Sequence, residues 1–416
     1  MTKIRQSVQL FFIWYFRLIA RFVIWRCCPK VITITGSVGK TTTKDVLIAQ
    51  FSSVMTTGGT IRSQNSEIST PLSILGIEIK NRERSVFVWV RLFFVGLGKV
   101  FFYKTPKVLI LEVGAGGPGD ITAVCKWLKS DFAVFTALAK NPVHVDHFES
   151  RQHLFNEKKQ LALLSKENAV VLFPKEDTFL KELLSDINRE IKTVSRSDIK
   201  EVQYNSKGTN IIFPDETQVQ INGVWSEVIA QSYIIGLEIA QILELSTDVI
   251  NRDFSKYYTP TPGRARLLEG IHGSTVIDDS YNASPVAVSA SLEVLSQVSV
   301  QGRKIFLFGD MKELGEYSVS AHENVAQDAL NVIDVLLTIG EESLITRKTI
   351  LSMGFDEEKT LHFEDSVDAG KWLSENMKSD DIVLAKSSRH AIKMELALQQ
   401  IVSPEQRHNL VQEYLK

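Results

Sequence analysis

The sequence predicts an α/β protein, with a P-loop parallel-sheet central domain followed by a smaller Rossmann-like α/β C-terminal domain. The β-branched run 31–35 ends at glycine, and a Gly-Lys-Thr turn follows, which is typical of a strand, a tight turn and a helix start. Further buried strands alternate with helical segments, as in a parallel sheet. A length of 416 residues leaves room for two or three domains with large cores.

The first element, residues 1–28, is predicted to be an apolar, basic helix. Insertion of its Val, Leu, Ile and Phe residues would gain roughly 3 to 7 kcal/mol, while Arg17 and Arg21 near the middle would cost about 5 to 7. The favourable and unfavourable free energies of crossing a bilayer therefore roughly cancel. Two alternatives stay open: a helix lying in the membrane interface, or a helix covering an apolar face of the protein itself. No cleavage site follows, so a signal peptide is not expected.

The second element is the phosphate-binding loop. Glycines let backbone N–H groups close on phosphate oxygens, Lys40 would reach the β- and γ-phosphates, and the Thr41 hydroxyl would hold Mg²⁺. Ile34 stands where the general P-loop has a small residue, so the match is to a shorter variant. The expected nucleotide-binding residues are Gly36, Ser37, Val38, Gly39, Lys40, Thr41 and Thr42.

A second basic and aromatic stretch, 86–103, precedes the next strand. It favours the membrane alternative, because this stretch and the N-terminal helix could act together as two weak membrane anchors. The strand 108–111 ends in Glu112, a carboxylate at the edge of a sheet where ligands bind. After the strand 132–136 come His144, Asp146 and His147, which either ligate a metal or fill a polar loop. The run 157–159 is predicted to open the next helix, and by itself it is a solvated charge run.

Composition excludes other classes. A net charge of −2 argues against a nucleic-acid surface. Three cysteines, two of them adjacent, make neither a disulfide framework nor a metal site, and so indicate a reducing cytoplasm.

These motifs, taken in order, resemble the Mur ligase family, and within it the branch that adds D-alanyl-D-alanine to the muramyl tripeptide of peptidoglycan. The resemblance covers about nine tenths of the chain. It is carried by the segments 35–44, 65–72, 111–114, 118–121, 144–150, 262–264, 277–285, 308–315 with His322, and 385–389. The strings Asp-Asp-Ser-Tyr-Asn-Ala-x-Pro and Gly-Asp-Met-x-Glu-Leu-Gly indicate this branch.

The resemblance implies an ATP-dependent amide ligase that forms an acyl phosphate, with Lys40, Lys158, His144 and Arg264 as catalytic residues. It implies two Mg²⁺ ions, held by Thr41, Glu112, His144 and a carbamylated Lys158. In such a reaction the enzyme mainly neutralises charge and aligns groups.

The resemblance also divides the chain into a central domain, 29–259, and a C-terminal domain, 260–416. The latter would supply Arg264 to the ATP phosphates, Asp278 to the ribose, and Tyr281 and Asn282 near the base. Asp279 could instead cap a helix. The expected residues for the incoming dipeptide are Asp310, Met311, Lys386, Ser388 and Arg389. Closure of the two domains is expected to bring these groups together.

Three departures from the family pattern matter. Ser226 and Ile229 stand where asparagines are usual, Ser387 replaces a glycine, and the P-loop strand begins by residue 31, which leaves no room for the usual domain that binds the uridine diphosphate. The acceptor is therefore either lipid-linked and met at the inner face of the membrane, or UDP-linked. A poly-glutamate or folate-type ligase and a non-catalytic nucleotide-binding scaffold stay as alternatives, and a monomer is expected.

Overall fold

The computed structural model describes residues 2–60, 69–77, 86–138, 147–205, 208–221, 223–225, 227–388 and 392–412. The chain forms two compact units. The first comprises Met1–Leu138, His147–Ser195 and Ser232–Tyr257, and the second Ala139–Asp146, Arg196–Gln231 and Tyr258–Lys416. The expected domain boundary between residues 259 and 260 stays a prediction.

The first unit is built on a six-stranded parallel sheet with the order β2-β3-β1-β4-β5-β6. The strands are β1 (Lys30–Thr35), β2 (Thr57–Gly59), β3 (Val108–Glu112), β4 (Phe132–Phe135), β5 (Val170–Pro174) and β6 (Glu190–Val194). Four of the six, β1 and β3 to β5, are buried along almost their whole length, because helices cover both faces.

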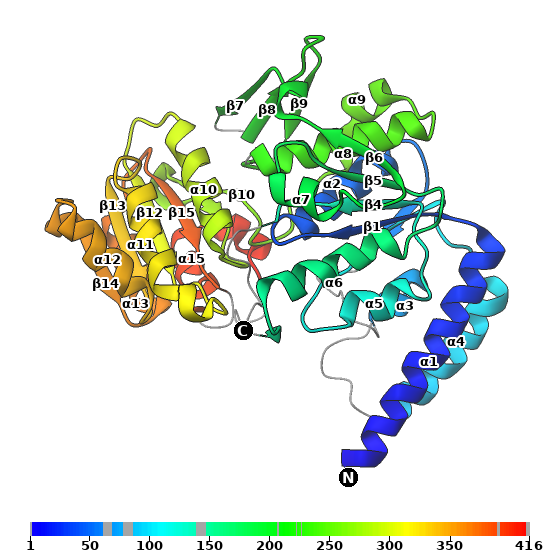
Figure 1. Ribbon diagram of the computed structural model, residues 1–416. Coiled ribbons are helices and arrows are strands. Elements are labelled where there is room, and N and C mark those ends of the chain that lie inside the picture. The colour runs from blue at the N-terminus through cyan, green and yellow to red at the C-terminus, as the bar shows by residue number, and fades with distance from the viewer. Residues whose placement is uncertain are drawn as a thin grey trace. The chain divides into compact units, whose positions relative to one another are not determined.

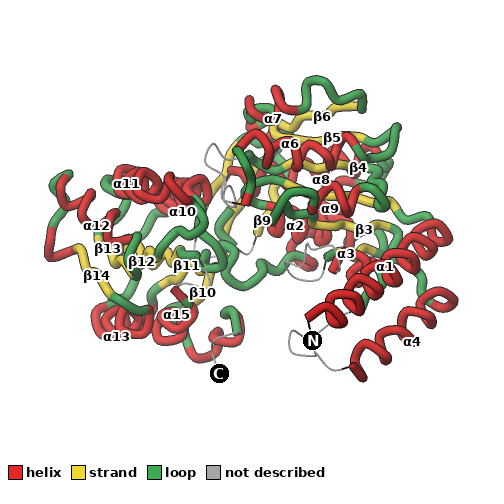
Figure 2. Tube along the Cα trace, turned by 60° about the horizontal axis from the view of Figure 1, so that its bottom comes forward, coloured by secondary structure: helices red, strands yellow, loops and turns green. Residues whose placement is uncertain are grey.

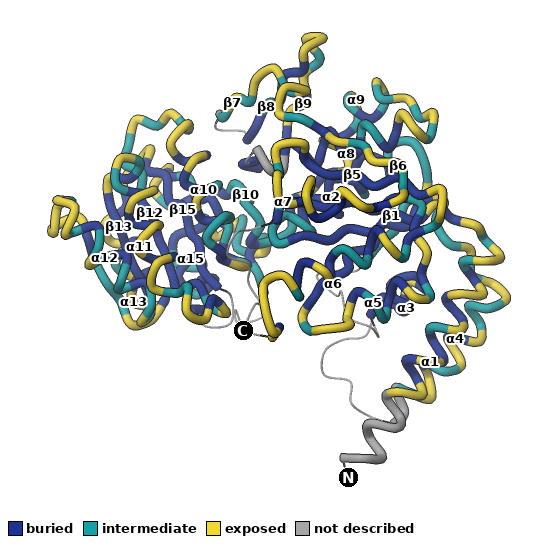
Figure 3. Tube along the Cα trace, viewed as in Figure 1, coloured by how far each residue is buried: buried dark blue, intermediate teal, exposed yellow. Residues whose placement is uncertain are grey.

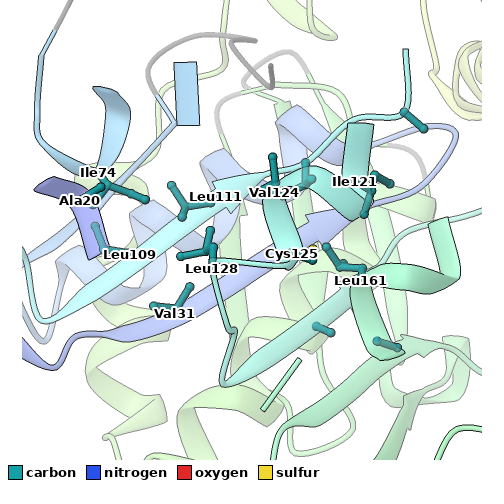
Figure 4. Close-up of a cluster of buried hydrophobic side chains, with 14 of the residues drawn as sticks. Ala20, Val31, Ile74, Leu109, Leu111, Ile121, Val124, Cys125, Leu128 and Leu161 are labelled. Atoms are coloured by element: carbon teal, nitrogen blue, oxygen red, sulfur yellow. The ribbon is translucent and has the colours of Figure 1, made fainter. Parts of the chain in front are cut away.

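Helices flank both faces of this sheet, with α3, α5 and α6 on one side and α2, α8 and α9 on the other (Figure 1). The helices of this unit are α1 (Thr2–Cys27), α2 (Lys40–Ser52), α3 (Ser69–Ile74), α4 (Val86–Phe102), α5 (Asp120–Cys125), α6 (Arg151–Leu163), α7 (Thr178–Leu183), α8 (Glu227–Ile242, whose first residues belong to the second unit) and α9 (Thr247–Tyr257). Figure 4 shows the core on one face, where Val31, Leu109 and Leu111 of the strands meet Val124 and Leu161 of the helices.

The N-terminal helix α1 lies beside α4, and both helices run in the same direction (Figures 1 and 2). Tyr15 stacks on Phe93 at 4.7 Å between ring centroids, and its hydroxyl donates to the Phe93 carbonyl at 2.5 Å. Near the other end, the Arg26 guanidinium donates to the carbonyls of Val100, Phe101 and Tyr103. A cation at the last carbonyls of a helix satisfies orphan acceptors and complements the helix dipole.

One side of α1 is buried in the core of the first unit, with Phe16, Ala20 and Val23 fully buried. The alternative in which this helix covers an apolar face of the protein is therefore confirmed for that side. Among the described residues, none of the helices has both the length and the apolar character needed to cross a membrane.

The second unit holds a six-stranded sheet with the order β10-β11-β15-β12-β13-β14, parallel except for β10. A separate three-stranded antiparallel sheet has the order β7-β8-β9. The strands are β7 (Glu201–Asn205), β8 (Gly208–Ile212), β9 (Gln218–Ile221), β10 (Arg266–Glu269), β11 (Thr275–Asp278), β12 (Lys304–Gly309), β13 (Val335–Ile339), β14 (Thr360–Phe363) and β15 (Ile382–Lys386).

Alternating side chains of β12 enter the cores on the two faces of the larger sheet, as the period of two requires. Phe306 and Phe308 pack with α10 and α11, while Ile305 and Leu307 pack with α13 and α15. The α-helices of this unit are α10 (Pro285–Gln297), α11 (Ser318–Ala329), α12 (Ser343–Ser352), α13 (Ser366–Asn376) and α15 (Glu395–Ile401). Short 3₁₀ helices occupy Arg196–Asp198, Ile271–Gly273, Gly315–Tyr317, Glu357–Lys359 and Pro404–Asn409. The predicted α/β class is confirmed in both units.

Candidate active site

The phosphate-binding loop leaves β1 at its carboxyl end, between β3 and β4, where the strand order of the sheet reverses. Ligands of open parallel sheets bind at such a switch point. Gly36 has φ +152°, and a Cβ there would stand 1.9 Å from Thr136 Oγ1, so no larger residue fits. Gly39 has φ +83° and starts α2 in the left-handed region, which glycine adopts without strain. The loop thus keeps its backbone amides close to the start of the helix, as an anion site requires.

Thr41 and Glu112 meet at this edge of the sheet. The Thr41 hydroxyl donates to Glu112 Oε2 at 2.9 Å, and Glu112, the last residue of β3, is buried. The Glu112 N–H donates to the Thr60 hydroxyl at 2.9 Å, which fixes the end of the strand. Lys40 bends back over the loop, with Nζ 3.0 Å from the Gly36 carbonyl oxygen. Three of the predicted nucleotide and metal groups are therefore adjacent.

Lys158 is brought to the same loop by α6. Its Nζ donates to Ser37 Oγ at 3.0 Å, and its side chain is buried. Burial lowers the pKa of this amine well below its ordinary value, and the positive charge of Lys40 lowers it further. Lys158 is thus a buried amine with an increased neutral fraction, beside the phosphate-binding loop.

The interpretation of 157–159 as a charge run at a helix start was wrong. Helix α6 begins at Arg151 behind a Ser150 N-cap, so these residues lie within it, and Glu157 and Lys158 are buried. Glu157 accepts from the Thr122 N–H at 2.8 Å and the Thr122 hydroxyl at 3.1 Å, while Lys159 pairs with Asp186. Tertiary contacts with α5 override the polar appearance of the run.

His144 and Asp146 lie outside the described residues. Of the three polar side chains predicted in that loop, His147 is described, and its Nδ1 lies 2.7 Å from the Gly116 carbonyl oxygen. The role of His144 as a metal ligand therefore stays a prediction.

In the second unit, Gly263 and Asp278 build a tight structure at the end of β11. The Gly263 N–H donates to Asp278 Oδ2 at 3.0 Å, and the Tyr281 N–H donates to the Gly263 carbonyl at 3.0 Å. Oδ1 of Asp278 accepts from the Ser280 hydroxyl at 2.5 Å. Asp278 is fully buried, and burial raises its carboxyl pKa. Both carboxylate oxygens thus hold the backbone of this turn, and their contact with a ribose stays a prediction.

Arg264 follows this turn and lies over the Tyr281 ring, with its guanidinium carbon 4.3 Å from the ring centroid. Its Nε is buried and has no hydrogen-bond partner among the described residues. An aromatic ring attracts a guanidinium placed over its face, and the planar set of N–H donors of that group suits an oxygen-rich ligand. Asn282, one residue beyond Tyr281, is exposed.

Asp279 does not cap a helix, so that alternative was wrong. The N-cap of α10 is Ser284, while Asp279 accepts from the Ala265 N–H at 3.1 Å and the Ser291 hydroxyl at 2.8 Å. It also pairs with Lys386, whose amine is buried. Burial lowers the pKa of Lys386, and Asp279 opposes that effect. Lys386 thus has a partner already within its own unit.

The predicted dipeptide residues Asp310, Met311 and Ser388 converge at the end of β12. The Asp310 carboxylate accepts from the Ser343 N–H at 2.8 Å and pairs with Lys312 at 2.9 Å, while its carbonyl accepts from the Ser388 N–H at 2.9 Å. Met311 is fully buried in the core, so its side chain supports this loop from within. Arg389 lies outside the described residues.

A buried histidine on α11 holds the Met311 backbone. His322 accepts from the Met311 N–H at 3.2 Å through Nε2, and its Nδ1 lies 2.8 Å from the Ser318 carbonyl oxygen. An Nε2 that accepts and an Nδ1 that faces a carbonyl indicate the neutral ring with its proton on Nδ1, and burial, which lowers the pKa of His322, favours the same form. His322 is therefore a structural support of the Gly-Asp-Met loop.

Two family models match this chain. The Mur ligase middle domain matches residues 34–236, and the glutamate ligase domain of Mur ligases matches residues 263–389. Together the two models account for well over half of the chain.

The chain belongs to the Mur ligase family.

Among curated Mur ligases, the UDP-N-acetylmuramoyl-tripeptide–D-alanyl-D-alanine ligase of Bacillus subtilis is 23% identical over 384 residues, which cover 90% of this chain and 76% of the relative. Among solved structures, the MurF ligase of Thermotoga maritima in complex with ADP aligns with a TM-score of 0.75 at 26% identity, over 93% of this chain and 83% of that one. A bifunctional folylpolyglutamate synthase/dihydrofolate synthase from Yersinia pestis aligns with a TM-score of 0.60 at 18% identity, over 91% of each chain, and shows a shared fold alone.

The residues present fit a Mur ligase that binds a magnesium nucleotide. Mg²⁺ takes one or two protein oxygens together with phosphate oxygens and water, so Thr41 and Glu112 suffice for one ion. No group of three or more His, Cys, Asp and Glu side chains that could hold a metal is found in the described part of the chain, and such a group is not required there.

Sequence reasoning missed several supporting residues. Thr60 accepts from the Glu112 N–H and so fixes the end of the strand. Lys312, which pairs with Asp310, also pairs with Glu342 at 2.7 Å. Lys312 lies inside the recognised Gly-Asp-Met-x-Glu-Leu-Gly string and could have been found there. Thr60 and Glu342 carry no local signal, because their partners are distant in sequence.

Proposed function

We propose that this chain is an ATP-dependent ligase of peptidoglycan synthesis that joins D-alanyl-D-alanine to a muramyl tripeptide through an acyl phosphate. The observation that carries the proposal is the cluster of Lys40, Thr41, Glu112 and Lys158 around one phosphate-binding loop in a Mur ligase fold. The relatives that act on these substrates align over about nine tenths of the chain. Because ATP is a substrate, we place the enzyme in the cytoplasm.

The chemistry requires charge neutralisation and alignment more than covalent participation of the protein. A carboxylate oxygen of the acceptor forms a bond to the γ-phosphorus while the bond to the leaving ADP breaks. The amine of the dipeptide then attacks the acyl carbon, phosphate leaves, and the ammonium proton is released. Lys40 and the loop amides would stabilise the transferred phosphoryl group, and Arg264 would add a planar cation to it.

Bound Mg²⁺ would neutralise phosphate charge, and we propose two such ions. Thr41 and Glu112 would hold one, and His144 with Lys158 would hold the second. For the latter, Lys158 would be carbamylated: its neutral amine forms a bond to the carbon of CO₂ and loses a proton, which gives a carboxylate-like group. The support is its burial and its lowered pKa, because only the neutral amine attacks CO₂. A ¹³C NMR carbamate signal in ¹³CO₂-equilibrated protein, absent from Lys158→Ala, would test this.

The dipeptide is proposed to bind near Asp310, Met311, Lys386, Ser388 and Arg389. Of these, Met311 is buried and would support the site from the core. Asp278, Tyr281 and Asn282 are proposed to serve the nucleoside. A monomer stays the expected state, and membrane contact of residues 1–28 and 86–103 stays a proposal.

The decisive experiment measures ADP release with the acceptor tripeptide and D-alanyl-D-alanine, each omitted in turn. We expect ADP release to require both, and Lys40→Ala to abolish it. Turnover without the amine would refute the ligase proposal. A poly-glutamate or folate-type ligase is the alternative, because a folylpolyglutamate synthase shares this fold. Replacing the dipeptide by L-glutamate in the assay tests that alternative. UDP-linked and lipid-linked acceptors, assayed side by side, identify the form of the substrate.

A further inference from the structure

The pair of parallel helices α1 and α4 exposes an unusual amount of apolar surface. Among the described residues, twelve of the twenty exposed large hydrophobic side chains belong to these two helices. Figure 3 shows exposed positions recurring along both of them, although β1, β3, β4 and β5 of the same unit are almost entirely buried. Exposed apolar residues are normally scattered singly, so this concentration indicates an interaction surface.

The exposed residues of α1 follow a helical period. Phe11, Trp14, Leu18, Phe22 and Trp25 are spaced by three or four residues and are all exposed, Trp25 by 73%. The buried residues of the same helix, such as Phe16 and Val23, interleave with them and enter the core. Helix α1 therefore has two apolar sides, and packing within the protein explains only one.

Helix α4 repeats this arrangement. Val90, Phe94, Leu97 and Phe101 are again spaced by three or four residues and are exposed. Leu92 is buried, and Phe93, which stacks on Tyr15, packs against the same core. We call the exposed residues of the two periods the apolar stripes.

The charges on these segments are all of one sign. Residues 2–27 and 86–107 contain nine Lys and Arg residues and no Asp or Glu. Arg21 and Arg91 are exposed on the helices themselves, and Lys104 and Lys107 are exposed just after α4. Apolar aromatic surface accompanied only by cations complements the interface of a bilayer that contains anionic lipids.

We propose that the apolar stripes of α1 and α4 dock this protein on an anionic membrane surface, with the helices lying in the interface. A second copy of the chain is a poorer occupant, because a two-fold contact would bring the same cations of both copies together. Trp14 and Trp25 suit the headgroup depth that tryptophan prefers. The proposal goes beyond the ligase function and does not depend on it, since it concerns residues outside the phosphate-binding loop.

The test is flotation of the full-length protein with vesicles of phosphatidylcholine mixed with phosphatidylglycerol, and with vesicles of phosphatidylcholine alone. We expect binding to the mixed vesicles and at least about tenfold weaker binding to the neutral ones, because each basic residue near an anionic surface contributes attraction. The variant Trp14→Ser/Phe22→Ser/Phe94→Ser should lose binding. Arg21→Glu/Arg91→Glu should bind at least about tenfold less.

The matched control is Val319→Ser/Val367→Ser, which removes exposed apolar side chains from the second unit. This variant should bind like the wild type, and a cooperative urea-unfolding transition like that of the wild type shows that each variant is folded. Failure of the wild type to float with the mixed vesicles, equal binding to both vesicle types, or equal loss in the control would overturn the proposal. A dimer that the stripe variant converts to a monomer, without any vesicle binding, would instead assign the surface to a second copy.

Discussion

At the residue scale, Lys158 has the most distinctive environment of the predicted site residues. It is buried in the middle of α6, donates to Ser37, and lies close enough to Lys40 for the two positive charges to oppose each other. A protonated amine in such a place costs free energy of folding. The same environment that disfavours the ammonium ion makes the neutral amine available for reaction with CO₂.

The lowered pKa of Lys158 predicts a pH-dependent stability. Because the unfolded chain binds this proton more tightly than the folded one, the unfolding free energy rises with pH from the lowered pKa up to the ordinary lysine range. In CO₂-free buffer, Lys158→Met should therefore be more stable than the wild type at neutral pH, by about 1.4 kcal/mol for each tenfold decrease in proton affinity. The gain should shrink as the pH rises.

Urea unfolding between about pH 6 and about pH 9 measures this difference. Lys159→Met is the matched control, because Lys159 neighbours Lys158 on the same helix and pairs with Asp186. Its effect should not vary with pH in this range. An equal and constant difference for both variants would contradict the prediction.

Glu112 gives a second residue-scale prediction. Glu112→Gln keeps an oxygen that can accept from the Thr41 hydroxyl, so the fold should survive, but it removes the negative charge from the proposed metal site. We expect kcat/KM for MgATP to fall about 10²- to 10³-fold, the range typical of a lost electrostatic group in an active site. The concentration of Mg²⁺ needed for half-maximal activity should rise. The control is Thr60→Val, which removes the acceptor for the Glu112 N–H and should have a smaller effect. An unchanged Mg²⁺ requirement in Glu112→Gln would count against metal binding by Glu112.

At the element scale, the turn between β1 and α2 depends on glycine at its first position. Gly36→Ala would place a methyl group 1.9 Å from Thr136 Oγ1, at a φ of +152°. Relief requires a shift of either the loop or Thr136, which directly follows β4, so we expect a loss of about 1–3 kcal/mol in unfolding free energy. Nucleotide binding should weaken at least tenfold. Gly98→Ala on α4 is the control, because nothing lies within 4 Å of its added Cβ, and it should be neutral or stabilising. Equal behaviour of the two variants in urea unfolding would refute the argument.

The sequence predicted elements well where a local signal was strong. The β-branched and apolar runs of β1, β3 and β4 were placed to within a residue, because buried parallel strands require such runs. Helix α6 was misread, since its buried Glu157 and Lys158 look polar in sequence, and only contacts with Thr122 and Ser37 explain them. The pairing of Lys386 with Asp279, 107 residues apart, and the internal use of both Asp278 oxygens depend on tertiary structure that no local pattern encodes.

At the scale of the whole molecule, each unit has its own sheet and its own core. The phosphate-binding loop belongs to the first unit and Arg264 to the second. If both contact the nucleotide, as we propose, binding must stabilise the molecule through groups from both units. Ligand linkage makes this contribution measurable without any turnover.

We therefore predict that an unhydrolysable MgATP analogue, at a hundredfold excess over its Kd, stabilises the wild type by about 2.7 kcal/mol. Lys40→Ala should abolish the stabilisation, and Arg264→Ala should weaken binding about tenfold, which removes about 1.4 kcal/mol of it at the same analogue concentration. Arg252→Ala is the control, because Arg252 is an exposed arginine of α9 that pairs with Asp253. Thermal unfolding with and without the analogue provides the measurement. A full wild-type stabilisation in Arg264→Ala would show that Arg264 contributes nothing to nucleotide binding, and would refute its proposed contact with the phosphates.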